Sequence, residues 1–218
     1  MYNRIIVLMA CFFCCLSIMQ AQPFIKEINA FKQQDSASMP PENAILFAGS
    51  SSFRLWKTVQ SDFEGYTIIN RGFGGSSLPD VIRYNDAILF PYIPKQVVIY
   101  CGENDFAVDP KIAVDSVIER FKTLFGLIRQ RLPKTAIAFV SMKPSPSRWT
   151  MKDKMIAANL GIKQFLKKQK RTAYIDVWTP MLAENGEPIK DLFLKDSLHM
   201  NAKGYAIWKK AIEPALKK

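Results

Sequence analysis

The sequence of 218 residues has little of what several kinds of functional site require. It contains one histidine, His199, and four cysteines, three of them within the first 15 residues. A single histidine excludes a histidine-rich metal centre, and so few cysteines exclude a fold held together by disulfides. The glycine-rich segment 72–76 lacks the following lysine and the spacing of a phosphate-binding P-loop, so we expect no bound nucleotide.

Acidic residues are scarce relative to basic ones. Lys and Arg number 30 against 19 Asp and Glu, which gives a formal net charge of +11. Seven of the basic residues lie in segment 152–171 together with one acid. We interpret this segment as a solvent-exposed helix face, and attraction to anionic lipid or a polyanionic glycan is the alternative. Aromatic residues are not interleaved with the basic ones, so we expect no nucleic-acid partner.

A hydrophobic run at the N-terminus predicts a targeting segment. Arg4 is followed by an uncharged, mostly apolar stretch of 15 residues, Ile5–Met19. This stretch is shorter than a membrane span and typical of the core of a signal peptide. We predict cleavage after Ala21 and export to the periplasm or the medium. The alternatives are an uncleaved anchor and a lipoprotein signal that ends in Cys11.

Cleavage after Ala21 would leave Cys101 as the only cysteine and would remove the one candidate membrane segment. We therefore divide the chain into a signal peptide (1–21), a short helix with a linker (22–43) and one globular domain (44–218). Hydrophobic residues make up 49% of the sequence and charged residues 22%, which is typical of a folded chain with a sizeable core.

Short apolar segments alternate with longer amphipathic ones along the domain. The apolar segments are residues 44–48, 66–70, 96–101, 135–140 and 173–177. The first four carry continuous apolar runs, as strands covered on both faces do. Apolar residues at helical spacing predict three helices. The first begins at Asp109–Pro110, with Asp109 as its cap, the second lies within 151–170, and the last is capped by Asn201. The alternation predicts an α/β fold with a parallel sheet and helices on both faces.

Polar residues follow the ends of these strands, which is where an open parallel sheet binds its ligands. Ser50–Ser52 follow the first strand, Gly72–Ser76 the second and Gly102–Asp105 the third, and the loop Asp196–His199 comes late in the chain. Together the four segments contain a hydroxyl nucleophile, a base, a carboxylate and donors for an oxyanion.

A serine hydroxyl is a poor nucleophile until a base removes its proton. Ser51 suits this role because Gly49 permits a tight turn before it. His199 is the sole histidine and so the candidate base. Asp196, three residues earlier in the same loop, is the candidate carboxylate that orients the imidazole. The backbone N–H groups of Ser51 and Gly75 and the side-chain amide of Asn104 are the candidate oxyanion donors.

Alternatives stay open for these roles. Ser50 or Ser52 could replace Ser51 as the nucleophile, and Asp176 could replace Asp196 as the orienting acid. Glu103 and Asp105 lie beside Asn104, but no second cluster of ligands accompanies them, so we expect neither a metal nor a cofactor.

In four blocks the sequence resembles the SGNH hydrolases, also called GDSL-like lipases or acylhydrolases. The blocks are Ile45–Ser52, Asn70–Gly75, Gly102–Asp105 and Asp196–Tyr205, in the order that the family has. The resemblance covers roughly residues 44–214. It implies a three-layer α/β/α fold, flavodoxin-like, around a parallel five-stranded sheet.

The resemblance assigns the same roles to the same residues: Ser51, Asp196 and His199 as a catalytic triad, and Ser51, Gly75 and Asn104 as the oxyanion hole. It also exposes departures from the family's pattern. Ser50 stands where the family usually has Asp, Ser52 where it has Leu, and Ser76 where an Asp is often found. We expect these changes to affect substrate preference more than mechanism.

The sequence thus predicts an exported serine ester hydrolase of the acylhydrolase or O-acetylesterase type, acting on a small-molecule, glycan or lipid ester without a cofactor. A lysophospholipase-like lipid esterase is one alternative, although the chain has no long apolar lid segment. A non-catalytic glycan-binding module on the same fold is the other.

Overall fold

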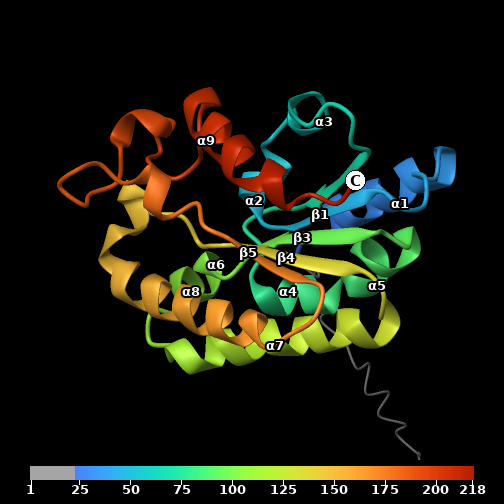
Figure 1. The fold of residues 1–218 in the computed structure, drawn as a ribbon, viewed down its shortest axis with the longest axis horizontal. Coiled ribbons are helices and arrows are strands. Elements are labelled where there is room, and N and C mark those ends of the chain that lie inside the picture. Colours follow the sequence, from blue (N-terminus) through green and yellow to red (C-terminus); the bar gives the residue numbers. More distant parts are fainter. Residues whose placement is uncertain (1–22) are drawn as a thin grey trace, which may run out of the picture.

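A single parallel sheet forms the centre of the computed structural model, which describes residues 23–218 (Figure 1). Its strands are β1 (Ile45–Gly49), β2 (Ile68–Gly72), β3 (Gln96–Tyr100), β4 (Ala136–Val140) and β5 (Thr172–Ile175). They lie in the order β2-β1-β3-β4-β5, and all neighbours pair in parallel. This confirms the predicted α/β fold with its five-stranded sheet. The predicted signal peptide, residues 1–21, lies outside the described residues.

Helices cover both faces of this sheet (Figure 1). The α-helices are α1 (Ile25–Ala37), α2 (Ser51–Arg54), α3 (Val59–Asp62), α4 (Leu78–Arg83), α5 (Asn85–Ile88), α6 (Glu103–Val108), α7 (Val114–Arg131), α8 (Lys152–Lys167) and α9 (Ala202–Ile212). Short 3-10 helices are η1 (Phe90–Tyr92), η2 (Pro146–Met151), η3 (Thr179–Met181), η4 (Lys190–Leu192) and η5 (Glu213–Ala215). Helices α2, α3 and α9 pack on one face of the sheet, and α4 to α8 pack on the other.

The sheet separates two hydrophobic cores. Alternate side chains of a strand point to opposite faces, so Val97 and Ile99 of β3 enter one core and Val98 and Tyr100 enter the other. Because both faces of the sheet are covered in this way, the side chains on both sides of a strand are buried, and the strands have continuous apolar sequences. The C-terminal ends of all strands face the same edge, where the loops carrying the candidate site residues follow.

Two predicted helix starts have different outcomes. Asn201 caps α9 as expected, because its side chain accepts hydrogen bonds from the N–H groups of Lys203 and Gly204. The predicted start at Asp109 was wrong: α7 begins at Val114. Asp109 instead closes a turn, in which the N–H of Ile112 donates to its carbonyl at 3.1 Å. That turn separates α6 from α7.

The segment expected to be a short helix and linker contains α1, which packs on the domain. Its residue Ile28 is buried in the larger core. Among the helices of residues 23–218, none has the length and hydrophobicity needed to cross a membrane.

Gly49 and Gly126 differ in the space that a side chain would have at each position. Gly49 ends β1 at φ +134°, and a Cβ there would lie 2.0 Å from the carbonyl oxygen of Tyr100. Gly126 lies inside α7 with open space around its Cβ position.

We expect Gly49→Ala to lower the free energy of unfolding by more than about 2 kcal/mol, because both strain and a clash result. Gly126→Ala should raise it by about 0.5–1 kcal/mol, since alanine favours the helix. Urea denaturation measures both. A Gly49→Ala protein as stable as the parent would contradict the close approach of β1 and β3.

Candidate active site

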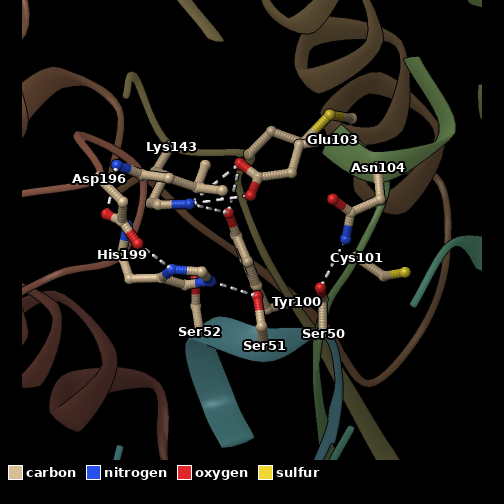
Figure 2. Close-up of polar contacts among 12 residues, drawn as sticks. Ser50, Ser51, Ser52, Tyr100, Cys101, Glu103, Asn104, Lys143, Asp196 and His199 are labelled. Carbon is tan, nitrogen blue, oxygen red and sulfur yellow. Dashed lines mark hydrogen bonds and ion pairs between the residues drawn. The ribbon is translucent and has the colours of Figure 1, made fainter. Parts of the chain in front are cut away.

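The turn between β1 and α2 places Ser51 at the C-terminal edge of the sheet (Figure 2). Ser50 is extended, and its N–H donates to the carbonyl of Tyr100 at 2.9 Å, which fixes the turn to β3. Ser51 is then the first residue of α2. Because a helix leaves its first N–H groups without intrahelical partners, the N–H of Ser51 is available to an incoming group.

Three side chains from two distant segments form a hydrogen-bonded row (Figure 2). His199 Nε2 lies 3.0 Å from Ser51 Oγ, although 148 positions separate the two residues. His199 Nδ1 lies 2.6 Å from Asp196 Oδ2. A base within hydrogen-bond reach of a hydroxyl, itself oriented by a carboxylate, is the arrangement that activates a serine nucleophile.

Asp196 is held in place by the chain that follows it. Its Oδ1 accepts hydrogen bonds from the N–H groups of Leu198 and His199, both at 2.9 Å, and Ser197 between them has φ +56°. Partial burial opposes ionisation, but these N–H groups and the His199 ring outweigh it and lower the pKa of Asp196 to about 2. An ionised Asp196 requires a hydrogen on Nδ1, which leaves Nε2 free to accept the proton of Ser51.

Neighbouring loops hold the segment that carries His199. The carbonyl of His199 accepts a hydrogen bond from the N–H of Leu194 at 2.7 Å. The carbonyl of Ser197 accepts one from the N–H of Ser147, in η2, at 3.1 Å. The cap of α9 by Asn201 follows directly. Backbone contacts on both sides therefore fix the direction of the imidazole.

The alternative residues have other surroundings. Ser52 Oγ is buried and makes no hydrogen bond within residues 23–218. Ser50 Oγ accepts a hydrogen bond from Asn104 at 2.7 Å. Asp176 caps η3, since its carboxylate accepts from Trp178, from the backbone of Thr179 and from the hydroxyl of Thr179. The imidazole is paired with Ser51 and Asp196.

The predicted oxyanion donors also come together. A Cβ on Gly75 would lie 3.9 Å from Asn104 Nδ2, so the loop after β2 and the start of α6 are adjacent. Asn104 Nδ2 donates to Ser50 Oγ at 2.7 Å and to the carbonyl of Ser76 at 3.0 Å. Both hydrogens of this amide are thus engaged, so an oxyanion that binds Asn104 has to displace either Ser50 Oγ or the carbonyl of Ser76 as an acceptor. Sequence reasoning missed the bond to Ser50, which arises where Ser50 replaces the family's usual Asp.

The sequence model of the GDSL-like Lipase/Acylhydrolase family matches residues 46–207, a span that includes every residue of this row. The chain belongs to this family. It is thus a member of the SGNH hydrolase superfamily and a serine ester hydrolase by class. No curated protein matches the sequence closely enough to count as a relative.

Solved structures share the fold of this GDSL-like hydrolase. A Streptococcus pneumonia protein named for platelet activating factor has a TM-score of 0.77 at 20% identity, covering 88% of this chain and 92% of its own. A GDSL-like lipase from Bacteroides thetaiotaomicron has 0.73 at 22%, covering 86% and 96%. A carbohydrate esterase family 3 protein from Talaromyces cellulolyticus has 0.63 at 17%, covering 78% and 94%.

A buried ion pair lies beside the row in this GDSL-like hydrolase, and sequence reasoning did not find it (Figure 2). Lys143, after β4, places its Nζ 2.9 Å from Glu103 Oε1 and 3.1 Å from the hydroxyl of Tyr100. The side chains of Lys143 and Glu103 are 0% and 3% exposed. Burial, and then the charge of Glu103, raises the pKa of Tyr100 well above its ordinary value. The cluster ties the ends of β3 and β4 together directly before Asn104.

The two acids beside Asn104 are thus both paired with cations of the chain. Glu103 pairs with Lys143, and Asp105 accepts from Arg120 at 2.8 Å and from the N–H of Leu78 at 2.9 Å. Burial raises the pKa of Asp105 despite these partners. In residues 23–218 no group of three or more His, Cys, Asp or Glu side chains has the arrangement of a metal site.

We expect Lys143→Met to lower the free energy of unfolding by about 3–5 kcal/mol, because Glu103 would remain buried without a counter-charge. Adding Glu103→Gln should recover a large part of that loss, since the double variant buries no unpaired charge. Urea denaturation of the parent, both single variants and the double variant measures this coupling. Strictly additive losses would contradict the ion pair.

Proposed function

We propose that this protein hydrolyses short-chain acyl esters, O-acetyl esters above all, through a Ser-His-Asp triad and an acyl-enzyme. The observation that carries the proposal is the row in which Ser51 Oγ, the His199 ring and the Asp196 carboxylate lie within hydrogen-bond distance. We also propose export, which rests on the sequence of residues 1–21.

In the first half of the reaction, His199 Nε2 takes the proton of Ser51 while Ser51 Oγ attacks the ester carbonyl. Asp196 keeps the hydrogen on Nδ1 and stabilises the imidazolium. The N–H groups of Ser51 and Gly75 bind the oxyanion of the tetrahedral intermediate together with the amide of Asn104, which exchanges one of its present acceptors, Ser50 Oγ or the carbonyl of Ser76, for the oxyanion. His199 then gives its proton to the leaving alcohol, and the acyl group stays on Ser51.

In the second half, His199 takes a proton from water, and the hydroxide attacks the acyl carbonyl. The second tetrahedral intermediate collapses, Ser51 Oγ leaves with the proton from His199, and the carboxylic acid is released. Every proton passes through one nitrogen, His199 Nε2, which alternates between base and acid. The cycle balances with the chain's own groups and one water.

A small acyl group is supported by the surface of the described residues. Four of their exposed large apolar side chains, those of Met39, Ile93, Val108 and Leu194, come from different segments, and the other two, Ile156 and Leu160, lie one turn apart on α8. A long-chain lipid needs a contiguous apolar surface larger than single side chains and one such pair provide. The fold shared with the Talaromyces carbohydrate esterase supports a carbohydrate ester as one candidate substrate class.

We expect Ser51→Ala to reduce hydrolysis of p-nitrophenyl acetate by at least about a thousandfold, because the nucleophile is removed. Ser52→Ala is the matched control, since Ser52 Oγ makes no hydrogen bond in residues 23–218, and it should leave the rate nearly unchanged. Labelling by a fluorophosphonate probe should be lost in Ser51→Ala only. Full activity of Ser51→Ala would refute the nucleophile, and an unreactive parent protein would favour a binding module.

We further expect acetylated xylan to be hydrolysed at least about tenfold faster than lysophosphatidylcholine at matched ester concentrations, because the exposed large apolar side chains of residues 23–218 are few and mostly scattered. Release of acetate and of fatty acid measures the two rates, with Ser51→Ala as the background. Faster hydrolysis of lysophosphatidylcholine would overturn the proposed acetylesterase function in favour of a lipid esterase.

A further inference from the structure

Helix α1 lies before the segment that the family model matches, yet its first turn contacts the candidate oxyanion loop. Glu27 Oε1 accepts a hydrogen bond from the N–H of Gly74 at 3.1 Å. Gly74 directly precedes Gly75. The same Oε1 lies 3.7 Å from Nε of Arg54, the last residue of α2, whose first residue is Ser51. One carboxylate therefore joins α1, the loop after β2 and the helix that carries the candidate nucleophile.

The start of α1 also limits the space around Gly74. Gly74 has φ +21°, and a Cβ there would lie 2.3 Å from Cε1 of Phe24 and 3.0 Å from Oε2 of Glu27. The Phe24 ring packs edge-on against Phe73, with ring centroids 5.3 Å apart. The backbone of the loop is thus held against α1 by one polar contact and one apolar contact.

Other contacts fix α1 to the domain along its length. Asp35, near the end of the helix, pairs with Arg71 of β2 and accepts from the hydroxyl of Tyr92 at 2.5 Å. At the other end, the hydroxyl of Tyr84 donates to the carbonyl of Pro23 at 2.5 Å. Burial, followed by the hydrogen bond to Asp35, raises the pKa of Tyr92 to about 12. Because both ends are attached, the position of Glu27 is defined by the fold.

The loop needs such an external constraint. It contains Gly74 and Gly75 and directly follows Gly72, the last residue of β2, and glycine restricts its own backbone less than any other residue. The N–H of Gly75 stabilises an oxyanion only if its direction is fixed before the reaction. A hydrogen bond from a neighbouring N–H to a carboxylate is stronger than one between neutral groups, so it is well suited to fixing this peptide.

We propose that Glu27 is a positioning residue: its carboxylate holds Gly74 so that the N–H of Gly75 points to the oxyanion. This inference rests on the proposed function, because it takes Gly75 as an oxyanion donor. Glu27 acts through the loop and touches neither substrate nor nucleophile. Helix α1 is then part of the catalytic unit, although it lies outside the matched segment.

The test compares Glu27→Met, Glu27→Ala and Glu27→Gln in the full chain, with p-nitrophenyl acetate as the substrate. Met and Ala remove the acceptor, so kcat should fall by about tenfold or more while KM stays within about twofold, since a small misplacement of a donor acts on the transition state. Gln keeps an acceptor oxygen at the same place and should retain kcat within about threefold. Gln33→Ala, an exposed position on the same helix, is the control and should change neither parameter.

The outcomes separate this inference from the proposed function. An inactive parent protein would end the proposed function. An active parent whose folded Met and Ala variants keep full kcat would overturn only the role of Glu27. A Gln variant as slow as the Ala variant would also overturn it, because the acceptor would not be what matters. Thermal melts establish folding, and failure of both Met and Ala variants to fold would reduce Glu27 to a structural residue.

Discussion

The imidazole of His199 is the group on which the arrangement of the candidate active site depends, because it contacts both Ser51 and Asp196 and so joins the two segments. Its two nitrogens have different environments: Nδ1 faces an ionised carboxylate at 2.6 Å, and Nε2 faces a hydroxyl at 3.0 Å. This difference selects one tautomer and so gives the ring a direction for proton transfer. The chain supplies no second histidine to take its place.

Charged residues around the row are arranged in pairs, each of which fixes a segment of backbone. Lys143 and Glu103 join the ends of β3 and β4, Arg120 and Asp105 hold the start of α6, and Arg71 and Asp35 hold α1. Buried charges are costly unless paired. The first two pairs lie where the chain leaves β3 and β4, and the third fixes α1 to β2. The pairs thus stabilise a few loop positions while the two apolar cores stabilise the sheet.

The family match and the solved structures establish different properties of the molecule, its family in one case and its fold in the other. The match over residues 46–207 places the chain among GDSL-like hydrolases, whereas the solved structures, at 17–22% identity, share its fold. In this chain Ser50 accepts a hydrogen bond from Asn104 at the position where the family usually has Asp, so the surroundings of this candidate oxyanion donor depart from the family's pattern.

The sequence by itself determined the strands, the parallel sheet and the candidate base, because apolar periodicity and a lone histidine are local properties that need no partner. For the nucleophile and the acid it left alternatives open beside Ser51 and Asp196, and only the folded chain pairs the His199 ring with these two residues. The sequence also determined the cap at Asn201. It failed at Asp109, where a turn competes with the start of α7, and it did not find the contacts of Lys143, Ser50 or Glu27. Those contacts join residues 40, 54 and 47 positions apart. Only the tertiary structure decides them, since a side chain's partner depends on which distant backbone packs beside it.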